Sequence, residues 1–221
     1  NSDNRLFRIV VHDHAGHPFQ VQLSRRLAEL GHEVLHLYSA DVETPRGRLV
    51  SGGRLTVESL STGRPLAKHH PLRRWRQERA YGRILARRVL DFAPHMVLSA
   101  NAGPAIQAAL VTAAHGAGIP VAIWVQDIYF AGVAGILRRV PTPIRWMAQS
   151  FVQRVELGAL RRADALVLIS PDFAVLLAGY GLHHPRTRII ENWAPLDDIV
   201  PRPKDNDWSR RHGLHDRFVF L

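Results

Sequence analysis

The chain has 221 residues, of which 46% are hydrophobic and 22% are charged, as in an ordinary globular domain with a buried core. It has no apolar run near the roughly 18 residues of a spanning helix. It has no cysteine, which excludes disulfides and thiolate metal sites and fits a reducing cytoplasm. The net charge of +10 comes almost entirely from arginine, since Lys68 and Lys204 are the only lysines. Such a charge suits nucleic acid, an anionic membrane or phosphate-bearing substrates, or is simply a solvated surface.

Short apolar segments alternate with helical patterns along the chain. This order predicts an α/β fold with a Rossmann-like, doubly wound and mainly parallel sheet of about seven strands. The first strand is apolar on both faces, as strands between two helix layers are. The expected strands are residues 6–12, 34–38, 55–60, 96–99, 121–125, 165–169 and 187–190.

Helices are expected between these strands because apolar residues recur there at helical spacing. The expected helices are residues 18–30, 75–92, 104–115, 142–162 and a short one from Pro171 to Gly179. The residues expected to face the core are Phe19, Leu23, Leu27 and Leu30 in the first, Tyr81, Leu85, Val89 and Phe92 in the second, and Ile144, Met147, Phe151 and Val155 in the fourth.

The remaining segments predict loops and a domain boundary. Residues 41–53 and 61–74 are irregular, and residues 128–140 read as an apolar loop that either packs on the core or dips into a bilayer. We expect a first domain over residues 1–193 and a linker over 194–217. Residues 218–221 then read as the first strand of a truncated second domain.

Candidate binding residues follow the strands, because ligands of open α/β sheets bind beyond the carboxyl ends of the strands. Gly16 lets a ligand approach the backbone just before a helix N-terminus, which favours phosphate, and His17 stands beside it. Three histidines in this segment, His12, His14 and His17, suggest a metal site, but no carboxylate or helical His pair joins them. The alternative to a metal site is a capped turn with solvated histidines.

Two further strand ends carry polar residues. Gln126 and Asp127 follow the fifth strand, where Asp127 is suited to hold a substrate hydroxyl, act as a base or cap the next turn. Asn101 follows the fourth strand as a cap or a ligand contact.

Several segments in order resemble family 4 glycosyltransferases of the GT-B fold. Residues 17–23 (HPFQVQL) and 27–34 (LAELGHEV) resemble the first helix and second strand of that family. Residues 165–170 resemble its strand ending in Ser, and residues 189–193 (IIENW) stand where the family has an apolar pair leading to Asn-Gly. The segment 124–127 and the Glu-Asn-Trp variant look closest to bacterial exopolysaccharide and O-antigen sugar transferases of the colanic-acid type.

The resemblance implies roles for residues that match the family positions. Gly16 would lie near the donor diphosphate and the acceptor, and Ser170 and Asn192 would shape the floor of the cleft. Gln126 stands where many members have a histidine near the transferred sugar. This departure makes the neighbouring Asp127 the expected catalytic anchor.

The resemblance also implies the reaction: a hexosyl group moves from a nucleotide sugar with retention, with no metal or other cofactor required. The acceptor would be a lipid-linked saccharide in surface polysaccharide synthesis, on the cytoplasmic side of the inner membrane. Arginines that would contact phosphate or anionic lipid are Arg73, Arg74, Arg138 and Arg139. Because the donor motif belongs to the second domain, we expect these 221 residues alone to be inactive. The alternatives are a nucleotide-sugar epimerase of similar fold and a basic nucleic-acid-binding module.

Overall fold

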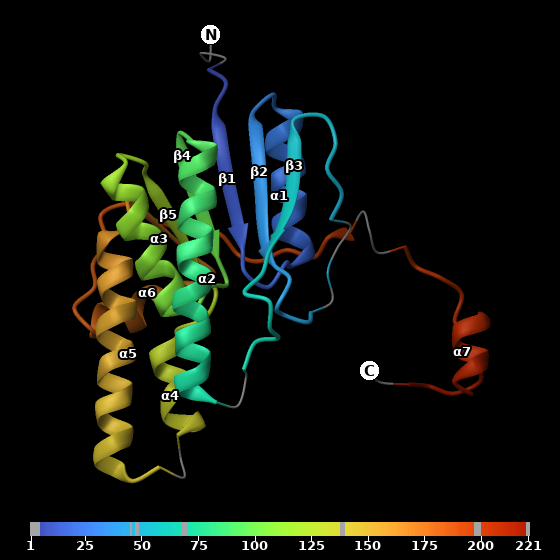
Figure 1. The fold of residues 1–221 in the computed structure, drawn as a ribbon. Helices are drawn as coiled ribbons and strands as arrows, with labels where there is room; N and C mark the ends of the chain where they lie inside the picture. The colour runs from blue at the N-terminus through green and yellow to red at the C-terminus, as the bar shows by residue number, and fades with distance from the viewer. Residues whose placement is uncertain are drawn as a thin grey trace.

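The computed structural model describes residues 5–44, 46, 49–67, 70–137, 140–196 and 200–219. In this part of the chain, seven strands, all parallel, form one sheet in the order β3-β2-β1-β4-β5-β6-β7 (Figure 1). This confirms the predicted fold class, and no predicted strand is off by more than two residues at either end. The strands are β1 (Arg8–Asp13), β2 (Glu33–Ser39), β3 (Leu55–Leu60), β4 (Met96–Ala100), β5 (Val121–Val125), β6 (Ala165–Leu168) and β7 (Thr187–Ile189).

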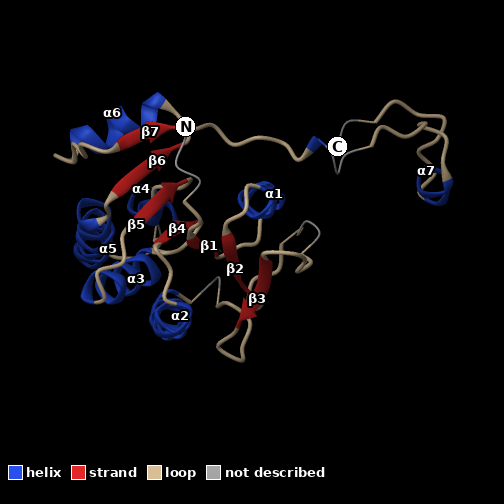
Figure 2. Ribbon diagram, turned by 90° about the horizontal axis from the view of Figure 1, so that it is seen from above, coloured by secondary structure: helices blue, strands red, loops and turns tan. Residues whose placement is uncertain are grey.

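Helices cover both faces of the sheet, with α1 on one face and α2, α3 and α5 on the other (Figure 2). Most begin with proline in the first turn, where its missing N–H costs nothing. Pro71 starts α2 four residues earlier than predicted, so the loop expected over 61–74 is shorter than its composition indicated. The helices are α1 (Pro18–Glu29), α2 (Pro71–Phe92), α3 (Pro104–Gly116), α4 (Tyr129–Ile136), α5 (Thr142–Arg162), α6 (Pro171–Gly179) and α7 (Asp207–Arg211).

The central strand β1 shows how the core is divided between the two faces. Val10 belongs to the larger cluster beneath α2 and α3, whereas Ile9 and Val11 pack with Leu27 of α1. Alternate residues of a strand point to opposite faces, so a strand between two helix layers must be apolar on both. Each of these fully buried aliphatic side chains stabilises the fold by roughly 1.5–3 kcal/mol.

The predicted inner face of α5 is wrong. Ile144, Met147 and Phe151 are 57%, 65% and 50% exposed, and the apolar residues that reach the core are Leu157, Ala159 and Leu160. Figure 1 shows the reason: the N-terminal half of α5 extends beyond the sheet, so only its second half lies over strands. The periodicity identified an apolar stripe but not how far the sheet beneath it reaches.

Two other expectations also need correction. Leu30 is 54% exposed and lies outside α1, which ends at Glu29. Most of the apolar stretch 128–140 is the helix α4 rather than a loop, and its Phe130 is buried with its ring 4.7 Å from that of Tyr180. α4 therefore packs as part of the domain, against α5.

The C-terminal segment lies away from the sheet (Figures 1 and 2). It carries the short polar helix α7, whose cap Asn206 accepts hydrogen bonds from the backbone of Trp208 and Ser209, each 3.0 Å long. Residues 218 and 219 are in no strand, and the last two residues of the strand expected at 218–221 lie outside the described part of the chain.

Candidate functional site

The polar residues of β1 and β4 meet where the strand order reverses. β1 connects towards β2 and β3, whereas β4 leads to β5 on the other side, so the crevice at their carboxyl ends is a ligand position. The Asn101 amide donates to Asp13 Oδ1 over 3.0 Å and lies 3.0 Å from His17 Nδ1. The backbone N–H groups of Ala15 and His17 also donate to the Asp13 carboxylate. The structure thus brings the predicted residues His17 and Asn101 together around a buried carboxylate.

Charge holds this cluster together. Burial alone would raise the pKa of Asp13, but the hydrogen bonds from His17 and Asn101 outweigh burial and lower it below its ordinary value. The hydrogen bond to Asp13, with a smaller contribution from the charge of Asp127, raises the pKa of His17 against the effect of its partial burial. Asp127 therefore lies close enough to His17 for their charges to interact.

Two residues of the crevice adopt a left-handed backbone conformation. Gly16 has φ +81° and Asn101 has φ +51°, a region that glycine and, less often, asparagine adopt. The position where a Gly16 side chain would begin is 3.5 Å from Arg46, whose guanidinium donates to the carbonyl of Ser39 over 2.9 Å. The positively charged side chain of Arg46 therefore lies against the loop that precedes the N-terminus of α1.

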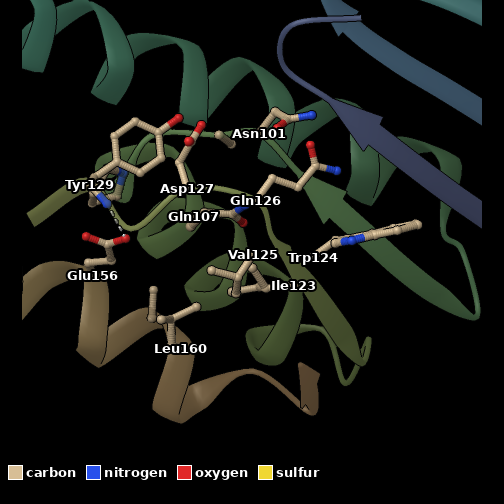
Figure 3. Close-up of a pocket in the computed structure, with 13 residues that line it drawn as sticks. Asn101, Gln107, Ile123, Trp124, Val125, Gln126, Asp127, Tyr129, Glu156 and Leu160 are labelled. Atoms are coloured by element: carbon tan, nitrogen blue, oxygen red, sulfur yellow. Dashed lines mark hydrogen bonds between the residues drawn. The ribbon is translucent and has the colours of Figure 1, made fainter. Parts of the chain in front are cut away.

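A small cavity of about 20 Å³ lies beside this cluster, under the loop after β5 (Figure 3). Asn101, Gln126 and Asp127 all line it. Within the described residues, Gln107 Oε1, Trp124 Nε1 and Gln126 Nε2 are buried in its walls and make no hydrogen bond. Buried polar atoms are nearly always paired, so three orphans around one cavity mark a place for hydroxyl groups or water.

Glu156 also lines this cavity. Its carboxylate accepts from the backbone N–H groups of Tyr129 and Phe130 over 2.9 and 2.8 Å, which caps the start of α4 (Figure 3). Burial raises its pKa from 4.5 to about 7, although these two hydrogen bonds oppose the rise. The backbone at the start of α4, next to Asp127, is therefore hydrogen-bonded to a carboxyl group, that of Glu156, whose pKa is about 7.

Aromatic rings support the opposite side of the crevice. Trp193, which follows β7, packs on Phe19 and Trp124 with ring centroids 5.4 and 5.7 Å away, and its indole N–H donates to Gln22 over 2.6 Å. Asn192 beside it is exposed. These contacts fix the chain after β7 across the N-terminal end of α1.

The six predicted binding residues therefore form one group and two outliers. Gly16, His17, Asn101 and Gln126 gather at the carboxyl ends of β1, β4 and β5. Ser170 and Asn192 lie at the same edge of the sheet, after β6 and β7 respectively. Ser170 is the N-cap residue of α6, as expected, but its side chain makes no capping hydrogen bond.

His12 of β1 and His14, which follows that strand, are buried, so the alternative of solvated histidines is wrong for these two. His12 Nδ1 lies 2.8 Å from Ser99 Oγ and its Nε2 lies 3.2 Å from Tyr81 Oη, while the His14 ring stacks edge-on against Tyr81. Burial lowers the pKa of His12 to about 3 and that of His14 to about 4. Among the described residues, no group of three His, Cys, Asp or Glu is placed to hold a metal ion.

The arginines predicted to contact phosphate or membrane have different environments. Arg73 is exposed, whereas Arg74 Nε donates to the buried carboxylate of Glu78 over 2.8 Å. That carboxylate in turn lies against the start of α3, where a Cβ on Gly103 would be 2.5 Å from it. Arg138 and Arg139 lie outside the described residues.

The sequence comparison decides the family. Glycosyltransferase Family 4 matches residues 19–198, which is most of the chain. The chain belongs to this family. A comparison of the sequence with curated proteins found no match.

Solved structures share the fold of this family 4 domain at low sequence identity. Sucrose-phosphate synthase from Thermosynechococcus elongatus has a TM-score of 0.63 and 13% identity, with 95% of this chain and 52% of that chain covered. Arabidopsis thaliana UGT89C1 complexed with UDP has a TM-score of 0.59 and 13% identity, with 96% of this chain and 55% of that chain covered. Anabaena HepE in complex with UDP-glucose has a TM-score of 0.56 and 14% identity, with 96% of this chain and 51% of that chain covered. The chain thus spans about half the length of these proteins and has the fold of a GT-B N-terminal domain.

Several residues of the family 4 domain were not predicted from sequence as parts of the site. Asp13 and Glu156 organise the two sides of the crevice, Gln107 supplies an orphan acceptor, and Arg46 covers Gly16. Asp13 ends a strand, which is a usable signal. Gln107 and Glu156 sit within helices, where only the tertiary structure shows that they are buried.

No helix in the described part of the family 4 domain has the length and apolarity needed to cross a membrane.

Proposed function

We propose that this chain is the acceptor-side half of a retaining glycosyltransferase, a hexosyltransferase, that uses a nucleotide sugar. The observation that carries the proposal is the crevice at the strand reversal, where the Asp13 cluster borders three buried polar atoms without partners. Saccharides present many hydroxyl groups. A site whose buried donors and acceptors lack partners selects a ligand that supplies such groups over one that does not. UDP and UDP-glucose in two proteins of the same fold support a nucleotide sugar as donor.

The residues at the crevice have distinct proposed roles. The N-terminus of α1 behind Gly16 and His17 faces the diphosphate, where the helix dipole and Arg46 stabilise the leaving charge. Asp127 is the catalytic anchor, which accepts a hydrogen bond from a hydroxyl of the reacting sugar. Asn101 and Gln126, together with Ser170 and Asn192, position the saccharides.

The substrate and setting extend this proposal. The acceptor is a lipid-linked saccharide of a surface polysaccharide pathway, as in the bacterial exopolysaccharide and O-antigen transferases of the colanic-acid type. The enzyme works on the cytoplasmic side of the inner membrane, where Arg73, Arg74, Arg138 and Arg139 face phosphate or anionic lipid. The chemistry requires neither a metal nor another cofactor, because α-helix N-termini and arginines neutralise the diphosphate. Residues 1–193 form the acceptor domain, 194–217 the linker and 218–221 the first strand of the donor domain.

Transfer assays with the protein that joins this chain to a donor-binding domain test the proposal. We expect sugar transfer from a labelled nucleotide sugar, which Asp127→Asn lowers about 100-fold in kcat/KM. The matched control Asp91→Asn, an exposed carboxylate at the far end of α2, should leave the rate unchanged. The 221 residues alone should show no turnover.

Three results would contradict this assignment. They are the absence of transfer from every nucleotide sugar tested, conversion of the donor to its epimer instead of transfer, and equal activity of Asp127→Asn and the control.

A further inference from the structure

Nearly all of the net positive charge lies in two segments. Residues 62–77 and 128–155 contain nine Arg or Lys and no Asp or Glu, whereas the rest of the chain contains 20 Arg or Lys and 19 Asp or Glu. A genome-wide preference for arginine would spread the excess over the whole surface. The charge is therefore local and points to an anionic partner at one place.

The described parts of these two segments meet at one end of the molecule. They contain the N-terminus of α2, α4 and the N-terminal half of α5, which project together beyond the carboxyl ends of the strands (Figure 1). The ring of Trp75 on α2 contacts that of Phe151 on α5, with 5.0 Å between centroids. The two helices thus present one continuous surface.

This surface also exposes large apolar side chains of the described residues. Phe151, Met147 and Ile144 lie along one stripe of α5, whereas Trp146, which is 66% exposed, lies about 100° around the helix from Met147. Ile144, Trp146 and Met147 are all within the first two turns of α5, at its projecting end. Leu72, one turn before Trp75 on α2, is 79% exposed. Behind the Trp75 ring an apolar cavity of about 150 Å³ separates α2, α4 and α5. Exposed apolar patches of this kind mark interaction sites.

We propose that this basic and apolar end, formed by Leu72, Arg73, Arg76 and the stripe from Ile144 to Phe151, docks on an anionic bilayer. The inference rests on the proposed lipid-linked acceptor and names the surface by which the enzyme reaches it. Trp146, Met147 and Ile144 enter the headgroup region, while the arginines pair with lipid phosphates.

Charge and side-chain chemistry favour a bilayer over other occupants. Arg, Trp and Met also occur in protein interfaces, so the sign of the charge decides between the occupants. The two segments carry nine Arg or Lys and no Asp or Glu, which suits the uniformly negative surface of an anionic bilayer. Single-stranded nucleic acid uses exposed aromatic rings for stacking, but Leu72, Ile144 and Met147 are aliphatic or thioether side chains with no such use.

Vesicle binding by the 221-residue chain tests the proposal without any sugar donor or acceptor. We expect salt-sensitive binding to vesicles of phosphatidylcholine and phosphatidylglycerol, and much weaker binding to phosphatidylcholine alone. The double variant Arg73→Gln, Arg76→Gln should bind the anionic vesicles roughly 30-fold more weakly. Trp146→Ala should weaken binding about tenfold, because an exposed ring no longer enters the bilayer.

Matched controls come from the same chain. Arg83→Gln with Arg87→Gln removes two exposed arginines of α2 about 15 Å farther along the helix, beyond a Debye length of about 8 Å. Trp208→Ala removes an exposed ring from α7. Both controls should bind almost as the unmodified chain does.

Four results would overturn the inference. They are no binding to anionic vesicles at low salt, equal losses in the arginine variant and its control, oligonucleotide binding as tight as vesicle binding, and a dimer that Trp146→Ala dissociates without any vesicle binding. Since no transfer is measured, a failure here leaves the transferase proposal standing, and the converse also holds.

Discussion

Replacing Glu156 by glutamine should change how the stability of the domain depends on pH. Glu156 is buried beneath α4, and burial raises the pKa of its carboxyl from 4.5 to about 7 although the backbone of Tyr129 and Phe130 donates to it. The folded state therefore keeps a proton on this group that the unfolded chain releases near pH 4.5. Glutamine keeps the shape and an acceptor oxygen but does not ionise.

The sign and size follow from proton linkage. Between pH 4.5 and 7 the folded state binds more protons at this site than the unfolded state, so the site makes the free energy of unfolding fall as pH rises. The shift from 4.5 to about 7 corresponds to roughly 3 kcal/mol lost across this range. The buried histidines His12, His14 and His36 act in the opposite direction, because their lowered pKa values cost stability as pH falls below 6.5.

The assay is denaturant unfolding of both proteins at a series of pH values. Subtracting the two curves cancels the histidine contributions, which both proteins share. The free energy of unfolding of Glu156→Gln minus that of the unmodified protein should rise by about 3 kcal/mol between pH 4.5 and 8. Glu29→Gln, which removes an exposed carboxylate of α1, is the control for the loss of one negative charge. A flat or falling difference for Glu156→Gln would mean that this carboxyl ionises normally in the folded state.

Three other substitutions test the crevice. Gly103→Ala places a Cβ 2.5 Å from the Glu78 carboxylate, so denaturant unfolding should show a loss of about 1–3 kcal/mol. Gly16→Ala puts a side chain on left-handed backbone at φ +81°, and the same measurement should show a loss of about 1–2 kcal/mol. Asp13→Asn removes the carboxylate that raises the pKa of His17, and an NMR titration should find that pKa lowered towards 6.5.

Controls for the glycine substitutions lie within helices. Gly116 of α3 and Gly158 of α5 would meet no atom within 4 Å if they carried a Cβ. Alanine there should leave stability unchanged or raise it by about 0.5–1 kcal/mol. A loss at these positions as large as at Gly103 would contradict the steric argument for Gly103.

The strands and most helix boundaries follow from local signals that are physical in origin. Buried parallel strands must be apolar on both faces, and a proline with no N–H to lose suits the first turn of a helix. Pro71 at the start of α2 obeys the same rule, but the proline and glycine just before it indicate a loop that continues to residue 74. The inner face of α5 was mistaken because periodicity gives the direction of an apolar stripe, and only the width of the sheet decides whether something covers it.

The site was predictable to the extent that it depends on strand ends. His17, Asn101 and Gln126 meet because the carboxyl ends of parallel strands share one edge of the sheet. The buried carboxylates that hydrogen-bond around the site, Asp13 and Glu156, were not predictable in the same way. Asp13 and Glu156 are made unusual by burial, which depends on packing between segments as far apart in sequence as β1 and β4.

The crevice and the basic, apolar end lie on the same side of the domain, which determines how a lipid-linked acceptor would reach the crevice. Both stand beyond the carboxyl ends of the strands, because α2 and α5 extend past the edge on which Asp127 lies (Figure 1). A domain held by Trp146 and its neighbours in a bilayer would present Asp127 towards the headgroups. An acceptor saccharide attached to a lipid would then reach the crevice by diffusion in the plane of the membrane. If so, losing the docking surface should raise the KM for a lipid-linked acceptor while leaving kcat for a soluble acceptor analogue unchanged.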